Sequence, residues 1–144
     1  MTTKSLQKIQ FSHLIPHSGS MSLIDKVESW NEKEIYCSSE SHLSSNNPLR
    51  LNNSLSAIHL IEYGAQSMAI HGGLLSGKSS PGYLAAVRGA HFHIDTLDNI
   101  KGLLYIEAKA ELKIDNGAVY GFYIYDHTKT LLLDARATVI HTNS

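Results

Sequence analysis

Cysteine, net charge and long apolar runs are all scarce in this chain, and each shortage excludes a class of protein. The single cysteine, Cys37, cannot form an internal disulfide, which is typical of a reducing compartment. Twelve basic and 13 acidic side chains give a net charge of −1, so no basic surface for nucleic acid or an anionic membrane is expected. No apolar run spans a bilayer, and the N-terminal MTTKSLQKIQFSH lacks the apolar core of a signal peptide. We therefore expect a cytoplasmic protein.

The length of 144 residues, with 42% hydrophobic and 17% charged residues, predicts a single globular domain, residues 1–144, with a proper core. The sequence shows no repeat, linker or low-complexity tract. It also has no glycine-rich phosphate loop and no Gly-x-Ser-x-Gly nucleophile motif. Neither a phosphate-binding loop nor a nucleophile motif therefore indicates the function.

The most apolar helical stretch is Leu55–Leu75, which reads LSAIHLIEYGAQSMAIHGGLL. Its apolar residues leave almost no polar face, so we expect other elements to wrap the helix. Asn53 or Ser54 is expected to cap its start, and Gly72-Gly73 is the expected place for it to fray or end.

Strands are expected on both sides of this helix. They are Leu23–Trp30, Ile35–Ser41, Gly82–Ile94, Leu103–Ile114, Ala118–Asp126 and Leu131–His141, after a short helix at Ser5–Phe11. In Leu103–Ile114 apolar and mostly charged residues alternate, which predicts a half-buried strand, and Asn116-Gly117 predicts a hairpin turn. An apolar helix between two strands and four strands requires a sheet that curls around it, so the fold class is α+β.

Glu62 is the one carboxylate within the apolar helix. An ionised glutamate in apolar surroundings costs several kcal/mol, so it must be paired, protonated or open to a pocket. Burial raises the pKa of a carboxyl group, and a general acid at neutral pH needs such a group. The alternative role is a structural glutamate hydrogen-bonded to a neighbour, and this residue alone does not decide between the two.

Three segments of the chain carry a resemblance to a known family. LIPHSGSMSLIDKV (Leu14–Val27) is similar to the family's L-P-H-x-x-P-x-L-L-x-D-x-V segment, and SAIHLIEYGAQ (Ser56–Gln66) to its P-G-V-x-x-x-E-x-x-A-Q helix. GYLAAVRGAHFHI (Gly82–Ile94) resembles the strand that pairs across the family's dimer. The three lie in the family's order. The family is the bacterial β-hydroxyacyl-ACP dehydratases, whose hot-dog fold wraps a curved antiparallel sheet around a long central helix.

The resemblance implies roles for individual residues. Glu62 falls on the helix carboxylate of the family's catalytic pair, and Gln66 on the glutamine of its A-Q motif. The backbone N–H of Ala57 falls where the family uses a glycine amide to polarise the thioester carbonyl. With His59, Ala57 and Gln66 are the substrate-binding candidates. The position of the family's catalytic histidine holds Pro48, which has no acid–base chemistry, so the chain resembles a divergent branch.

Other histidines are candidates for the missing base. His17, in the Pro-His turn of the N-terminal motif, is our first candidate, with a structural role in the loop as the alternative. His59 lies three residues before Glu62 on the same helix side, with a satisfied core histidine as the alternative. His91 and His93 alternate on one strand, but such pairs arise by chance in a chain with nine histidines. We expect no metal and no cofactor.

The activity that the resemblance implies is dehydration of a 3-hydroxyacyl thioester on acyl carrier protein to the trans-2-enoyl thioester. His17 would take the proton α to the thioester, and Glu62 would give a proton to the departing hydroxyl. The implied partners are acyl carrier protein and a second hot-dog subunit, either the same chain or a related dehydratase. Loss of the usual histidine favours a specialised lipid or polyene pathway over housekeeping fatty-acid synthesis.

Two alternative functions remain open. A hot-dog thioesterase would use Glu62 to activate water and would release a free thiol. A catalytically silent subunit would bind acyl chains or stabilise an active partner, and it would co-purify with a second hot-dog chain and show no turnover alone. Binding of nucleic acid or of a membrane is expected for neither.

Overall fold

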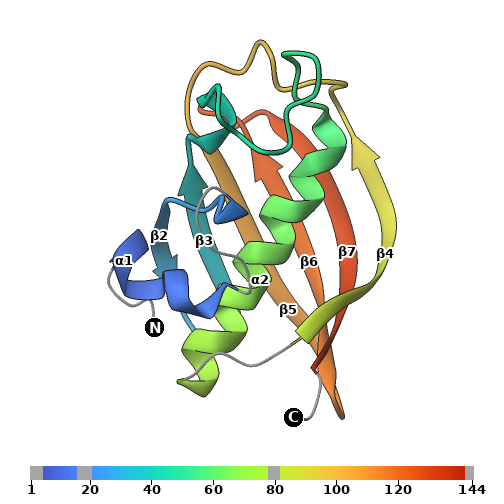
Figure 1. The fold of residues 1–144 in the computed structure, drawn as a ribbon. Helices are drawn as coiled ribbons and strands as arrows, with labels where there is room; N and C mark the ends of the chain where they lie inside the picture. The colour runs from blue at the N-terminus through green and yellow to red at the C-terminus, as the bar shows by residue number, and fades with distance from the viewer. Residues whose placement is uncertain (1–4, 16–20, 78–81, 142–144) are drawn as a thin grey trace.

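A curved antiparallel sheet of seven strands holds one long helix against its inner face (Figure 1). The computed structural model describes residues 5–15, 21–77 and 82–141. Its elements are β1 (Leu6–Gln7), α1 (Lys8–Phe11), η1 (Ser12–Leu14), β2 (Lys26–Trp30), β3 (Glu34–Ser39), η3 (Ser41–Leu43), η4 (Ala57–His59), α2 (Leu60–Ser76), β4 (Gly82–Phe92), β5 (Leu104–Ile114), β6 (Gly117–Tyr125) and β7 (Leu131–His141). The expected α+β class with a hot-dog arrangement is confirmed.

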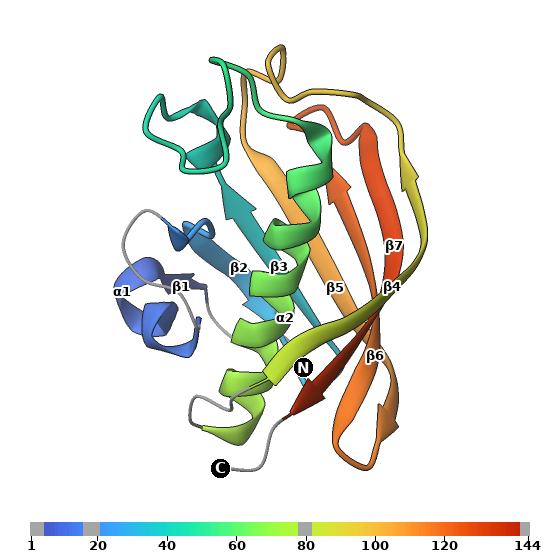
Figure 2. The same ribbon diagram turned by 45° about the vertical axis from the view of Figure 1, so that its right-hand side comes forward.

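The strands follow the order β1-β2-β3-β5-β6-β7-β4, and every neighbouring pair is antiparallel. The chain enters α2 after β3 and returns as β4 at the far edge of the sheet, beside β7 (Figures 1 and 2). The two-residue β1 and the 11-residue β4 are therefore the edge strands.

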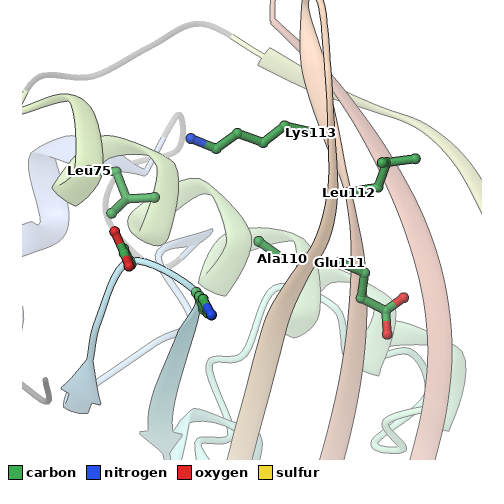
Figure 3. Close-up of a pocket in the computed structure, with 7 residues that line it drawn as sticks. Leu75, Ala110, Glu111, Leu112 and Lys113 are labelled. Atoms are coloured by element: carbon green, nitrogen blue, oxygen red, sulfur yellow. The ribbon is translucent and has the colours of Figure 1, made fainter.

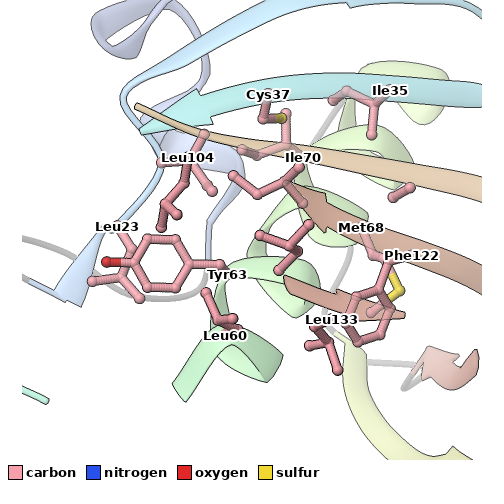
Figure 4. Close-up of a cluster of buried hydrophobic side chains, with 14 of the residues drawn as sticks. Leu23, Ile35, Cys37, Leu60, Tyr63, Met68, Ile70, Leu104, Phe122 and Leu133 are labelled. Atoms are coloured by element: carbon pink, nitrogen blue, oxygen red, sulfur yellow. The ribbon is translucent and has the colours of Figure 1, made fainter. Parts of the chain in front are cut away.

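The core lies between α2 and the sheet, as the apolar composition of the helix requires. Figure 4 shows Leu60, Tyr63 and Ile70 of the helix facing side chains of the strands, among them Leu104 and Phe122. All five are fully buried. Burying a side chain of this size contributes about 1.5–3 kcal/mol, so this contact is the main source of stability.

Two predictions about helices are wrong. Leu6–Gln7 pairs with Lys26 and Val27 as β1, so the first helix is only Lys8–Phe11. The long helix passes Gly72-Gly73 and ends at Ser76, where Gly77 takes the left-handed conformation with φ of 77°. A Cβ at Gly73 would lie 2.7 Å from Leu14 Cδ2, so this glycine permits close packing and does not end the helix.

The start of the helix also differs from the prediction, because the capping side chain is Ser56, at the start of the turn η4 that leads into α2, in place of Asn53 or Ser54. The Ile58 N–H donates to the Ser56 hydroxyl at 3.3 Å. This bond satisfies one of the amides that a helix start leaves without a partner.

The alternation predicted for Leu103–Ile114 holds in the first half of β5 only. Ile106 and Ala108 are buried, but the register shifts between Ala110 and Leu112, and Leu112 is 59% exposed. On the opposite face Glu107 is only 6% exposed, because it lies between the cross-strand neighbours Tyr36 and Tyr123. Its hydrogen bond with the Tyr36 hydroxyl raises the pKa of that tyrosine.

Among the described histidines, two are buried within the fold. His71 bonds through Nδ1 to the Tyr120 hydroxyl at 2.7 Å and through Nε2 to the Asn31 carbonyl at 2.8 Å. His42 bonds through Nε2 to the Ile100 carbonyl at 3.1 Å. Burial lowers the pKa of both histidines, so they are neutral at pH 7. Among the residues that the structure describes, no helix is long and apolar enough to cross a membrane.

Adding a methyl group at two helix glycines should have opposite effects. A Cβ at Gly64 would lie 2.5 Å from the ring of buried Phe122, so Gly64→Ala should destabilise the fold by about 1–3 kcal/mol through overpacking. At Gly72 the nearest atom is His141 Cε1 at 3.9 Å, so Gly72→Ala should stabilise it by up to about 1 kcal/mol. Urea unfolding of both variants checks the pair, and equal effects would contradict the packing described.

Stability should fall on acidification below the ordinary histidine pKa of 6.5. Because the folded pKa of His71 is lowered, the unfolded chain binds more protons between the two pKa values. Between its folded and unfolded pKa values, each such histidine lowers the free energy of unfolding by up to about 1.4 kcal/mol for each pH unit of acidification. Above the unfolded pKa it has no effect on stability. The free energy of unfolding, measured with urea at each pH from 7.5 to 5.5, should fall less steeply with decreasing pH for His71→Gln than for wild type. An unchanged slope would exclude His71 as a source.

Candidate active site

Glu62 lies in the first turn of α2, and its side chain is half-buried. The sheet covers one side of α2 (Figure 2), while Ile61 and Ala65 on the other side are only half-buried and Ile58 is 60% exposed. The sheet thus wraps the helix as expected, and Ile61 and Ala65 pack only at the margin of the core. The carboxylate therefore lies at the border between the core and an open helix face, where the start of the helix favours negative charge.

Gln66 joins the Glu62 carboxylate to the N-terminal part of the chain. Its Nε2 donates to Glu62 Oε1 at 3.3 Å and to the Met21 carbonyl at 2.6 Å. Its Oε1 accepts from the Leu23 N–H at 2.8 Å. Because the Gln66 side chain is only 2% exposed, these bonds are shielded from water and hold both groups in place.

His17, the first candidate for the base, lies outside the described residues. Met21 follows it by four positions in the sequence and is bound to Gln66, one helical turn from Glu62. The N-terminal motif and the helix motif thus meet at Gln66.

His59 occupies the N-cap position of α2 and is half-buried. Its backbone N–H donates to the Ser56 carbonyl at 3.2 Å. The structure therefore places His59 at the same end of the helix as Glu62, on the turn that leads into α2.

The Ala57 amide is engaged inside the protein. It donates to the Asp95 carbonyl at 2.8 Å, so in this arrangement it is not open to a thioester oxygen. The Asp98 carboxylate accepts from the Ser54 hydroxyl at 2.7 Å and from the Leu55 N–H at 3.0 Å. These bonds hold the pKa of Asp98 below its usual value and tie residues 95–98 over the start of the helix. The sequence offered no signal for this contact, which joins residues 43 and 44 positions apart.

The loop that holds Pro48 is fixed next to the same turn of α2. Pro48 itself is exposed, whereas Asn47 is 6% exposed and donates to the Tyr63 hydroxyl at 3.3 Å and to the Ser41 carbonyl at 3.0 Å. Tyr63 follows Glu62 in the helix, and burial raises the pKa of its hydroxyl. At the position of the family's histidine the structure thus has a proline in a loop held by a structural asparagine.

His91 and His93 share one carboxylate. His91 Nδ1 lies 2.9 Å from Asp134 Oδ1, and His93 Nε2 lies 3.3 Å from Asp134 Oδ2. The bond from His91 lowers the pKa of Asp134. Within the described residues no group of His, Cys, Asp and Glu is arranged to hold a metal ion.

A pocket of about 410 Å³ lies at the opposite end of α2, between Glu32, Lys33, Leu75 and Ala110–Lys113 (Figure 3). Leu75 lies 13 residues after Glu62, which corresponds to about 20 Å along the helix axis. This pocket is therefore separate from the Glu62 site.

The curved sheet around one central helix defines a hot-dog protein. The chain belongs to the ApeP-like family, described as ApeP dehydratase, whose model matches residues 9–144. The expected enzyme class, a dehydratase and hence a hydro-lyase, is confirmed by this membership.

Solved structures share the fold. The dehydratase heterocomplex ApeI:P from Xenorhabdus doucetiae matches with a TM-score of 0.81 and 18% identity, over 93% of this chain and 91% of that chain. A hypothetical thioesterase with coenzyme A from Streptococcus pneumoniae has a TM-score of 0.59 and 13% identity, over 82% and 85%. The PaaI protein of E. coli matches with a TM-score of 0.59 and 10% identity, over 84% of this chain and 80% of that chain. No curated protein matches the sequence significantly.

Removal of the Gln66 amide should loosen the site from the N-terminal segment. Gln66→Met leaves the Leu23 N–H and the Met21 carbonyl without their partner, which should destabilise the fold by at least about 1–3 kcal/mol. Gln10→Met is the matched control, because exposed Gln10 accepts a single bond from the Gln7 N–H, and it should change stability by less than about 0.5 kcal/mol. Urea unfolding compares them, and similar losses would refute the bridging role.

Proposed function

We propose that this chain acts in the dehydration of 3-hydroxyacyl thioesters carried on an acyl carrier protein. The observation that carries the proposal is the half-buried Glu62 carboxylate, held by Gln66 at the start of the central helix of a dehydratase-family protein. A carboxyl group in such a border position is held by the protein and lies beside a face that a substrate can reach, which is the placement that proton transfer to a substrate requires.

In the proposed reaction a base removes the proton on the carbon α to the thioester. The C–O bond to the β-hydroxyl breaks as Glu62 donates its proton to that oxygen, so water leaves and a trans double bond forms. Gln66 acts as a positioning residue, because its Nε2 bond to Oε1 restricts the rotation of the Glu62 carboxylate. Pro48 supplies no base.

A second hot-dog subunit is part of the proposal. The heterocomplex ApeI:P, which shares this fold, is a dehydratase assembled from two chains. The open face of α2 and the edge strand β4 offer a surface for such a subunit. We propose that a related chain pairs here and contributes the base, and that His17 of this chain is the alternative source. The missing base favours a specialised lipid or polyene pathway over housekeeping fatty-acid synthesis.

A structural subunit without catalytic groups is the second candidate. Two observations favour it: Pro48 at the position of the family's histidine, and the Ala57 amide that bonds to Asp95. The retained carboxylate argues against it, because a purely structural subunit has no need of a half-buried glutamate with a dedicated amide partner. Among the residues that the structure describes, no contact favours hydrolysis of the thioester.

Mass spectrometry of a 3-hydroxyacyl-ACP tests the proposal. The chain, alone and with its co-purified partner, should remove one water, and Glu62→Gln should slow this loss by about 10²–10⁴-fold, as expected for a general acid. His17→Ala, assayed alongside, locates the base in this chain if it has a similar effect and in the partner if it has none.

An assay for free thiol in the same samples serves as the control for hydrolysis. Release of thiol without dehydration would replace the proposal by a thioesterase. Turnover by the complex that Glu62→Gln leaves unchanged would favour the structural subunit.

A further inference from the structure

The edge strand β4 presents two chemically different sides. Leu84 and Val87 pack against the core, and Phe92, opposite buried Leu133, remains 38% exposed. The other side carries Arg88 and His91, both exposed. Among the described strands only β7 borders β4, so the outer edge of β4 is open over its 11 residues. An open edge of this length is a template for a further strand.

The charge on this edge is of one sign. Arg88 lies directly opposite Arg136 in the register, and Arg136 is paired through Nε with Glu111 Oε1 at 2.9 Å. Within the described residues Arg88 itself has neither an ion pair nor a side-chain hydrogen bond. The two histidines at this end already share Asp134. Arg88 is thus the unbalanced charge of the strand.

Pairing of β4 with a second copy of itself does not supply the missing charge. Around a two-fold axis, each residue of β4 faces another residue of the same strand, and Gly82–Phe92 contains no aspartate or glutamate. Every register therefore leaves Arg88 without an acidic neighbour on the facing strand. Like charges opposite each other destabilise a strand pair, and opposite charges stabilise it.

We propose that Arg88 selects the partner of this chain: the strand that pairs with β4 carries an acidic side chain facing Arg88, and a second copy of this chain is disfavoured. The inference rests on the proposed function, since it takes β4 as the contact with the second hot-dog subunit. The partner that fits is a hot-dog chain whose edge strand is apolar toward the helix layer and acidic on the outer face. Specificity of this kind arises from repulsion in the wrong pair as well as attraction in the right one.

The chain itself supplies the test through a charge-reversed copy. In the two-fold register that places Arg88 opposite its own copy, Arg88→Glu again gives a facing pair of like charge, but a mixture of wild type with Arg88→Glu joins opposite charges. Sedimentation analysis should give a mixed dimer about three- to tenfold tighter than either homodimer, and high salt should reduce this preference. Native mass spectrometry of the equimolar mixture should show the mixed dimer in excess over the half that random pairing gives.

Lys33→Glu is the matched control, because it makes the same change of charge at an exposed residue in the turn between β2 and β3, away from β4. Mixed with wild type, it should pair at random. Random pairing of Arg88→Glu with wild type, or no mixed dimer at all, would overturn the inference. The dehydration assay is a separate measurement. If turnover depends on Glu62 but Arg88→Glu pairs at random with wild type, the selection of the partner by Arg88 is refuted and the proposed function stands.

Discussion

One sheet covers only one side of a helix, and this constraint governs the rest of the structure. α2 has 17 residues and is apolar nearly all round, so covering it fully would take a second layer that the described chain does not have. Its far side keeps Ile61 and Ala65 half-buried, and Ile58 in the preceding turn η4 is exposed. Glu62 stands at the border of that side. The same geometry that leaves apolar surface uncovered thus brings a carboxylate to a place where a substrate or a second subunit can meet it.

Two segments remote in sequence converge on the start of α2 and use its polar groups differently. The Met21–Leu23 segment is held by the Gln66 side chain and leaves the Glu62 carboxylate oriented. The segment at residues 95–98 takes up backbone donors, because Asp95 accepts from Ala57 and Asp98 from Leu55. The protein thus keeps a carboxylate oriented in this region, while the amide expected to stabilise a carbonyl oxygen is bonded to Asp95. This combination suits a subunit that contributes the acid and depends on another source for the remaining groups.

Periodic patterns predicted most of the fold, and contacts between remote segments account for what they missed. Leu131–His141 matches β7 at both ends, and the order of two strands, a helix and four strands holds, with the short β1 added. The second half of β5 deviates because the register shifts after Ala110 and residues 111–114 are all exposed, and no residue type marks that shift. Gly73 was expected to end the helix, but its role depends on Leu14 packing against it.

For the site, the motifs placed Glu62, Gln66, His59 and Ala57 at one end of the helix, and the structure has them there. They did not predict that Glu62 is only half-buried, because the burial of a helix residue depends on which sides the sheet covers. Nor did they predict that Asp95 occupies the Ala57 amide, because the partner lies 38 residues away in a loop without a pattern.

Pro48, at the position where the resemblance implies a histidine, and Arg88 on β4 both bear on the choice of partner. Under the proposed mechanism, a dimer of this chain with itself would hold two Glu62 acids and a proline at each position where the resemblance implies a base. Unless His17 replaces that base, neither site of such a dimer would contain both proton-transfer groups. A copy bound in such a homodimer could not pair with the second hot-dog subunit that completes the proposed site. Arg88 without a counter-charge weakens the unproductive pairing, while the apolar row of Leu84, Val87 and Phe92 remains attractive to any hot-dog edge. Attraction from apolar burial is not selective, so discrimination between two similar partners has to come from charge, and Arg88 stands where charge can act.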